Sequence, residues 1–312
     1  MIRDLRGTDG AILFRLMDRE FPEESALLGG RPEGFERVVR RVYRWDMRFV
    51  LALLRLFGRP VFRFLAVEAD GHLVATTMVT FPRGSAYVSN VVVDPAYRRR
   101  GYAKRMLEEA LVTARRADRR FIALDVLDTN TAARTLYESL GYRPLRSSVH
   151  LVHDDLSKFA PPSPPNRAIR PFERSDAPAL VTIARRALPA RVAEVLPVGE
   201  SRFVHSSFEG RLLESEGAAW VVDRGRGAEG HVSGFRSAVF DAGNVSAPVL
   251  SESLEPALAV ELVRTAVAWC AGRKLPRVLA FVTDENPRGR AALEAAGFRD
   301  VLTSTTLYRT VD

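Results

Sequence analysis

The stretch VVVDPAYRRRGYAKRM, residues 91–106, decides how the first half of this 312-residue chain folds. Its β-branched run predicts a strand, Asp94-Pro95 a turn, and the pattern after Gly101 an amphipathic helix. A helix start exposes unpaired backbone N–H groups and the positive end of the helix dipole, and a glycine lets a ligand approach the backbone. Neighbouring arginines add charge-assisted contacts to an anion. The stretch predicts a phosphate-binding loop, and the alternative is a charge run that only faces water.

The chain also repeats itself on either side of a proline-rich linker. The segment KFAPPSPPNR, residues 158–167, predicts a stiff connection between a first domain, 1–157, and a second, 168–312. Two pairs of segments align across it: IRDLRGTDGAILFRLMD (2–18) with IRPFERSDAPALVTIAR (169–185), and DTNTAARTLYESLGYR (128–143) with DENPRGRAALEAAGFR (284–299). A repeat of this kind predicts two units of one fold.

Each half alternates strands and helices, which predicts an α/β fold with a mixed sheet covered by helices. Asp70-Gly71 between two apolar runs predicts a hairpin. A last strand, SSVHLVHD at 147–154, is expected to close the first half. The segment 35–58 predicts an amphipathic helix that packs on its own sheet, with contact to a membrane surface as the alternative.

At this point the sequence resembles the GCN5-related N-acetyltransferases (GNAT). The resemblance rests on VVVDPAYRRRGYAKRMLEEAL, with its Arg98-x-x-Gly101-x-Ala103, and on NTAARTLYESLGY, which begins 29 residues after Gly101. It covers about residues 2–156 and implies tandem acyl-CoA N-acyltransferase domains that transfer an acetyl group from acetyl-CoA to an amine. The residues that it assigns to the cofactor are Val91, Val92, Val93, Arg98, Arg99, Arg100, Gly101, Tyr102, Ala103, Lys104 and Asn130.

The resemblance also suggests two catalytic residues. Tyr137 matches the tyrosine that protonates the departing thiolate, and its alternative role is to pack a helix against the sheet. Asp125 stands where the ribosomal-protein alanine N-acetyltransferases carry a glutamate, and could accept a proton from the acceptor ammonium, directly or through water. Its alternative is a strand residue that faces solvent. Glu68 and Asn90 remain further candidates for contact with the acceptor.

The second half serves as an internal control for these assignments. Arg98 aligns with Leu254, Gly101 with Ala257, Asp125 with Phe281 and Tyr137 with Leu293, whereas Asn130 keeps its counterpart Asn286. We therefore expect the second half to be a degenerate copy that keeps the fold and lacks the phosphate loop. Since Asn286 persists without the chemistry, Asn130 is expected to cap its helix.

Composition limits the partners and the compartment. The net charge of +8 lies almost entirely in the first half but is interspersed with acids, so nucleic-acid binding is not expected. The sequence contains no run long and apolar enough for a membrane span, and its single cysteine, Cys270, suggests a buried thiol in a cytoplasmic protein. No metal is expected. The sequence does not identify the acceptor, which is a peptide or a small-molecule amine, and it does not decide whether the chain forms a homodimer. A non-catalytic role, as a regulatory module that binds acetyl-CoA, stays an alternative.

Overall fold

The computed structural model describes residues 2–20, 22–44, 62–82, 84–154, 156–159, 166–204 and 215–311. The helix expected at 35–58 is observed as part of α3 up to Val42, and its residues 45–58 lie outside the described ranges, as do residues 160–165 of the linker. Among the helices of the described ranges, none combines the length and the apolar character needed to cross a bilayer.

The first half contains six strands and five helices within the described residues. In chain order they are β1 (Ile2–Asp4), α1 (Gly10–Glu20), α2 (Pro22–Leu28), α3 (Pro32–Val42), β2 (Phe62–Ala69), β3 (His72–Thr80), β4 (Ser85–Val93), α5 (Tyr102–Arg116), β5 (Phe121–Leu127), α6 (Thr131–Ser139) and β6 (Arg143–Asp154).

The second half follows the same plan. Its elements are β7 (Ile169–Pro171), α7 (Ala177–Arg186), α8 (Ala190–Val195), β8 (Ser215–Asp223), β9 (Ala228–Ser237), β10 (Gly243–Val245), β11 (Val249–Leu250), α10 (Pro256–Ala271), β12 (Arg277–Thr283), α11 (Pro287–Ala295) and β13 (Arg299–Thr310).

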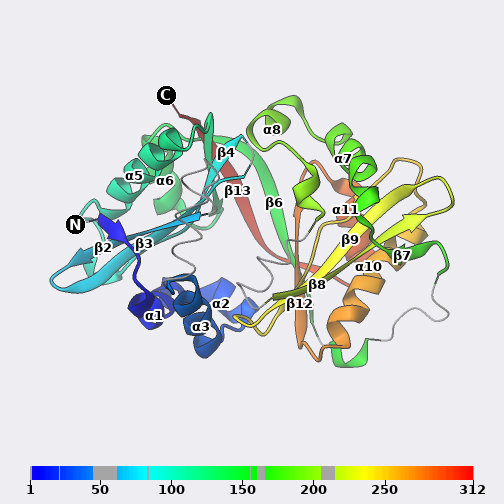
Figure 1. Cartoon of the computed structure of the whole chain (residues 1–312), viewed down its shortest axis with the longest axis horizontal. Helices are drawn as coiled ribbons and strands as arrows, with labels where there is room; N and C mark the ends of the chain where they lie inside the picture. The colour runs from blue at the N-terminus through cyan, green and yellow to red at the C-terminus, as the bar shows by residue number, and fades with distance from the viewer. Residues whose placement is uncertain are drawn as a thin grey trace.

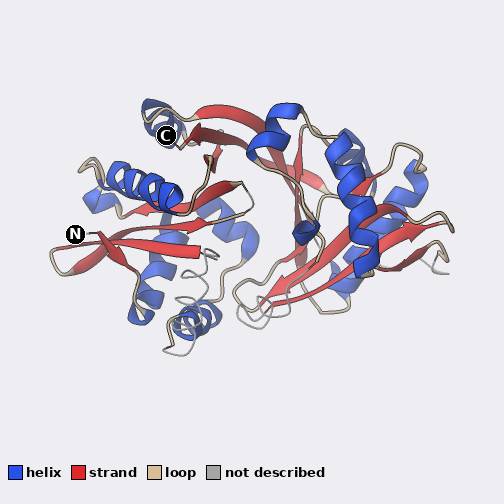
Figure 2. Ribbon diagram, turned by 45° about the horizontal axis from the view of Figure 1, so that its top comes forward, coloured by secondary structure: helices blue, strands red, loops and turns tan. Residues whose placement is uncertain are grey.

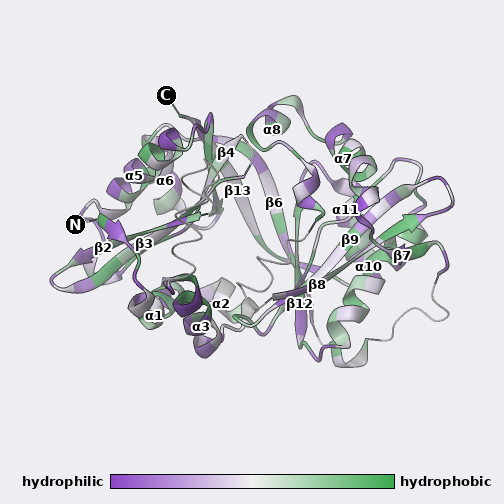
Figure 3. Ribbon diagram, viewed as in Figure 1, coloured by the Kyte–Doolittle hydropathy of each residue, from purple (hydrophilic) through white to green (hydrophobic). Residues whose placement is uncertain are grey.

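Helices cover both faces of the sheet in each half (Figures 1 and 2). In the first half, Leu65 packs in the cluster beneath α5 and α6, and the next residue, Ala66, packs beneath α1 on the other face. This alternation is what a strand with two covered faces requires. Hydrophobic residues accordingly colour long stretches of the strands in Figure 3. The predicted mixed α/β architecture is confirmed.

The last strands of the two halves are exchanged. The sheet order is β1-β2-β3-β4-β5-β13-β6-β12-β10-β9-β8-β7, with β11 paired to β9, so β13 lies between β5 and β6. The expectation that 147–154 closes the first half was wrong: β6 pairs with β12 and β13, and the C-terminus returns to the side of α5 and α6 (Figure 1). Both exchanged strands are long runs of alternating residues, and pattern alone cannot tell which edge each one joins.

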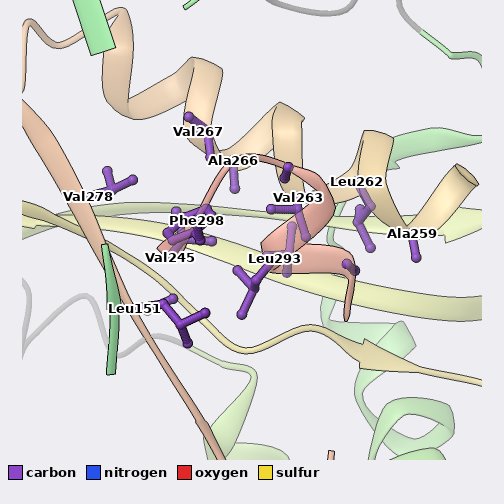
Figure 4. Packing of buried hydrophobic residues seen from close by; sticks show 14 of the residues in the cluster. Leu151, Val245, Ala259, Leu262, Val263, Ala266, Val267, Val278, Leu293 and Phe298 are labelled. Atoms are coloured by element: carbon purple, nitrogen blue, oxygen red, sulfur yellow. The ribbon is translucent and has the colours of Figure 1, made fainter. Parts of the chain in front are cut away.

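The exchange ties the two cores together. Leu151 of β6 is fully buried in the core of the second half, where it faces Leu293 and Phe298 (Figure 4). Leu307 of β13 is fully buried in the core of the first half. Cys270 lies in the second core, and burial raises the pKa of its thiol to about 12, which confirms the expected buried thiol.

The internal repeat is visible in its contacts. Arg3 donates to Asp9 at 2.7 Å in the first half, and Arg170 donates to Asp176 at 2.8 Å in the second. The Asn130 carboxamide oxygen accepts from the Ala133 N–H at 3.1 Å, and that of Asn286 accepts from the Gly289 N–H at 2.9 Å. Asn130 is therefore a helix cap, as expected, because the same cap is present where the chemistry is not.

One irregularity positions the site. Strands β4 and β5 pair in parallel from Ser85 to Val88 only, although β4 continues to Val93 along β3. A break in the β3–β4 register marks this point, and Asn90 there has a positive φ of 55°. Such a bulge bends a strand and ends its pairing. Beyond Val88 the two strands separate, and the backbone of β4 on that side is left without a strand partner.

Candidate active site

A cavity of about 660 Å³ lies where β4 and β5 separate. It brings together five of the residues singled out by the sequence: Asn90, Val91, Asp125, Asn130 and Tyr137. The rest of its wall comes from α1, α2 and the segment after it, from α3 and α6, from β4, β5 and β6, and from the second half, which contributes Phe240 and Ser304. The sequence motifs thus converge on one hollow in the described part of the chain.

Tyr137 reaches the cavity from α6. The side chain is 6% exposed and packs against Tyr142 at 6.1 Å between ring centroids. Burial raises the pKa of Tyr137 to about 12. The phenol therefore keeps its proton at neutral pH, the state that a proton donor needs.

Asp125 projects from β5 into the cavity and is exposed to it. Its Oδ1 accepts a hydrogen bond from the Thr306 hydroxyl of β13 at 2.6 Å. The Tyr87 hydroxyl also lies within hydrogen-bonding reach of this carboxylate, and burial followed by the Asp125 charge raises the pKa of Tyr87. These contacts fix the position of the carboxylate and leave it open to a ligand.

The two further candidates for acceptor contact lie in different places. Asn90 lines the cavity at the bulge of β4. Glu68 does not line it: its carboxylate accepts from Arg3 at 2.8 Å, and the Arg3 hydrogen bond is the main cause of its lowered pKa. Glu68 therefore joins β2 to β1 and takes no part in this cavity.

The loop after β4 has the shape expected of an anion cradle. Gly101 caps α5 with a φ of +76°, and a Cβ added there would meet nothing within 4 Å. The first N–H groups of α5, from Tyr102, Ala103 and Lys104, have no partner within the helix. The open space over Gly101 and these donors fits a phosphate group.

The three arginines differ in their contacts. Arg98 forms an ion pair with Glu20, a residue of the cavity wall. Arg100 stacks on Tyr97 at 4.9 Å and donates to the Ala96 carbonyl at 3.4 Å. Arg99 has a positive φ of 63° and is exposed. Residues 98–104 do not line the cavity themselves, and the ion pair between Arg98 and Glu20 connects this loop to the cavity wall.

The packing of Val91, Val92 and Val93 leaves their backbone available. Val92 is buried under α1, and Val91 and Val93 pack partly against Met106 and Val67 on the other side. All three belong to the part of β4 beyond its pairing with β5. This edge can donate to and accept from an extended ligand as a neighbouring strand would.

In the second half the corresponding loop makes different contacts. Leu254 is 1% exposed, and the Arg288 guanidinium donates to the carbonyls of Ser251 and Leu254. Pro256 begins α10 and removes one N–H donor, while Glu255 forms an ion pair with Arg224 at 3.2 Å. The second half thus keeps the helix but places Pro256 and the acidic Glu255 at its start.

Sequence reasoning missed the residues that other elements bring to the cavity. His150 of β6 accepts or donates a hydrogen bond with the Ser304 hydroxyl at 2.9 Å, and burial lowers the pKa of its imidazole. Neither residue belongs to a motif, and both reach the cavity through the strand exchange. Both are polar residues in the interior of long strands, which by itself indicates no site.

Comparison with known proteins agrees with this geometry. Residues 18–142 match the model of the acetyltransferase (GNAT) family. The first half of the chain thus carries a region of the GNAT family of acetyltransferases. The matched residues include the loop at Gly101, Asp125 and Tyr137, and enzymes of this family use acetyl-CoA.

Two curated relatives show how far the sequence likeness extends. A ribosomal protein bS18-alanine N-acetyltransferase of Salmonella typhimurium is 32% identical over 88 residues, which are 28% of this chain and 60% of that protein. A mycothiol acetyltransferase of Clavibacter michiganensis is 25% identical over 252 residues, 78% of this chain and 74% of that protein. The chain thus spans about three fifths of the length of that alanine N-acetyltransferase and about three quarters of the length of the mycothiol acetyltransferase.

Solved structures share the fold over the whole chain. A tandem GNAT protein from the clavulanic acid biosynthesis pathway aligns with a TM-score of 0.64 and 16% identity, over 100% of this chain and 98% of that one. A GCN5-related N-acetyltransferase from Sphaerobacter thermophilus aligns with a TM-score of 0.63 and 19% identity, over 100% and 95%. At these identities the likeness establishes the fold alone.

Proposed function

We propose that the chain transfers an acetyl group from acetyl-CoA to a primary amine, and that the first half carries the catalysis. One observation supports this most: the cavity between β4 and β5 holds both Tyr137 and Asp125, and β4 leads directly into the open loop at Gly101. The second half has lost the counterparts of all three residues, and we propose that it completes the acceptor side of the cavity.

The residues present fit acetyl-CoA. The N–H groups at the start of α5 and the Arg98, Arg99 and Arg100 side chains would hold its pyrophosphate. The free edge of Val91 to Val93 would hold its extended arm, and the cap Asn130 would shape the wall near it. Bound there, the cofactor supplies an activated thioester.

The side chains then have distinct tasks. Asp125 faces the cavity with one oxygen fixed by Thr306, and it would take the proton that the acceptor ammonium must lose before it can attack. Tyr137 keeps its proton at neutral pH, and it would give that proton to the departing thiolate. Both groups would act in one complex of the two substrates, by direct attack of the amine.

For the acceptor we propose a chemical class, a primary amine. The relatives are named for an alanine of ribosomal protein bS18 and for mycothiol, so a peptide N-terminus and a small-molecule amine are both candidates. The alternative function is a regulatory module that binds acetyl-CoA without turnover. It predicts tight cofactor binding and no acetylation of any amine.

Thiol release from acetyl-CoA in the presence of a panel of amines tests the proposal. Tyr137→Phe should lower kcat by about 10²-fold or more, since general acid–base catalysis contributes at least that much, and should leave the affinity for acetyl-CoA unchanged. Tyr142→Phe is the matched control, because this buried neighbour has an unpartnered hydroxyl and does not line the cavity. Equal turnover of Tyr137→Phe and wild type would remove Tyr137 from the mechanism.

A further inference from the structure

A second cavity, of about 330 Å³, lies in the corresponding opening of the second half. Its wall includes β11, β12 and the cap Asn286, the counterparts of the elements that frame the first cavity. The two cavities share three wall residues, Asp125, His150 and Ser304. The proposed base therefore stands where the two cavities meet.

Two arginines, Arg146 and Arg202, line this second cavity. Arg146 of β6 has a buried Nε with no hydrogen-bond partner, and neither Arg146 nor Arg202 forms an ion pair with another described residue. Arg202 is exposed, and its pKa is lowered by the protein packed around its guanidinium and further by the positive charge of Arg146. The two neighbouring cations repel each other, and Arg146 is partly buried, so an anion between them would offset this cost.

The same cavity also contains carboxylates that the arginines do not neutralise. Asp125 enters it from the shared wall, and Glu285 has a buried Oε2 with no hydrogen-bond partner. Phe281, which replaces Asp125 in the repeat, adds an apolar surface that is 47% exposed, the only exposed large hydrophobic side chain among the described residues. A cavity with unpaired groups of both signs fits a ligand that carries both charges better than a simple inorganic anion.

We propose that this second cavity binds the acceptor, and that the acceptor is a small amine that also carries an acidic group, such as an amino acid or a phosphorylated amine. The acidic group pairs with Arg146 and Arg202, the body lies on Phe281, and the amine lies at Asp125. The cofactor opening that the second half no longer uses thus serves the acceptor of the first half. This inference rests on the proposed acetyl transfer.

The reaction balances with these groups. The acceptor nitrogen loses one proton to Asp125 before attack and forms a bond to the acetyl carbon. The bond from that carbon to sulfur breaks, and the sulfur receives a proton from Tyr137. After attack the nitrogen loses a second proton. Of the two protons that leave the nitrogen, one passes from Asp125 to solvent and one replaces, through solvent, the proton that Tyr137 gave to the sulfur, so both side chains return to their starting states.

Matched pairs of acceptors test the inference. The pairs are 4-aminobutyrate with butylamine, phenylalanine with phenethylamine, and O-phosphoethanolamine with ethanolamine, which separate carboxylate from phosphate and both from a plain amine. We expect acid-bearing members to have a kcat/KM about 10- to 100-fold higher, the effect of one or two hydrogen bonds between charged groups.

Variants of Arg146 and Arg202 test whether these two residues bind the acidic group of the acceptor. Arg146→Gln and Arg202→Gln should each raise KM for the acid-bearing acceptor about 10- to 100-fold. KM for acetyl-CoA and turnover of the plain amines should not change. Arg143→Gln is the control, because this exposed residue lies on the same strand and lines neither cavity. Should Arg146→Gln not fold, Arg202→Gln outside the strands carries the test alone.

The outcomes separate this inference from the proposed function. Acetylation of plain and acid-bearing amines at equal kcat/KM, with both arginine variants like wild type, overturns the inference and leaves the acetyltransferase in place. If no amine is acetylated, the proposed function fails, and calorimetry with the same amino acids decides the inference. Saturable binding that Arg146→Gln abolishes supports an acid-binding cavity, and no binding by the wild type overturns it.

Discussion

Substitution of Gly101 tests the cofactor loop most sharply. Its φ of +76° belongs to the left-handed region, where a side chain costs about 1–2 kcal/mol, and no atom lies within 4 Å of the position of a Cβ. Gly101→Ala should therefore lower the Tm by about 2–4 °C through strain alone, without a clash. The new methyl group would occupy the space in which we place the phosphate.

Gly101→Glu should do more, because it adds a negative charge there. Hydrogen bonds from N–H groups to a charged group contribute about 1.5–3 kcal/mol each, so losing two of them weakens acetyl-CoA binding by about two to four orders of magnitude. Isothermal titration calorimetry with acetyl-CoA measures this directly, and a thermal melt measures the strain.

Two other glycines provide matched controls. Gly71 and Gly225 have φ values of +77° and +84°, and a Cβ at either would also meet nothing within 4 Å. Their Ala variants should show the same fall in Tm and wild-type affinity for acetyl-CoA. If Gly101→Glu bound acetyl-CoA as tightly as Gly225→Glu, the loop would not be the phosphate site.

Two further predictions concern stability. The hydrogen bond from Arg170 lowers the pKa of Asp176 in the folded protein. The ionised Asp176 therefore stabilises the fold fully above its pKa in the unfolded chain, about 4, and this contribution is lost as the pH falls through its pKa in the folded protein. Asp176→Asn should therefore lower the Tm at pH 6 and much less at pH 3; a constant difference would contradict this. The fragment 1–157 should not fold alone, because β5 lacks β13 and the core lacks Leu307, and adding 168–312 should restore a cooperative melt by circular dichroism. Cooperative unfolding of the monomeric fragment by itself would refute the role of the exchange.

The local features of the fold followed from the sequence. The loop at Gly101, the caps Asn130 and Asn286 and the repeat depend on residue types at short spacing, where backbone geometry and hydrogen-bonding capacity decide the outcome. That the second half lacks a phosphate loop stays a prediction from the repeat, and the structure adds the hydrogen bonds from Arg288 to the carbonyls of Ser251 and Leu254.

Long-range features of the fold could not be predicted from the sequence. Strands β6 and β13 have equal lengths and similar patterns, so their exchange depends on tertiary packing. The contributions of His150, Ser304 and Phe240 to the cavity depend on that exchange and on contacts between the halves. The pairing of Arg98 with Glu20 joins residues 78 positions apart, and no pattern near either one indicates it.

The central claim is that one cofactor site, in the first half, serves the whole chain. A crystal structure of the protein with CoA tests it most directly. We predict one CoA per chain, with its pyrophosphate on the backbone at Gly101 and its thiol in the cavity beside Tyr137. CoA bound at the start of α10, or in both halves, would contradict the account.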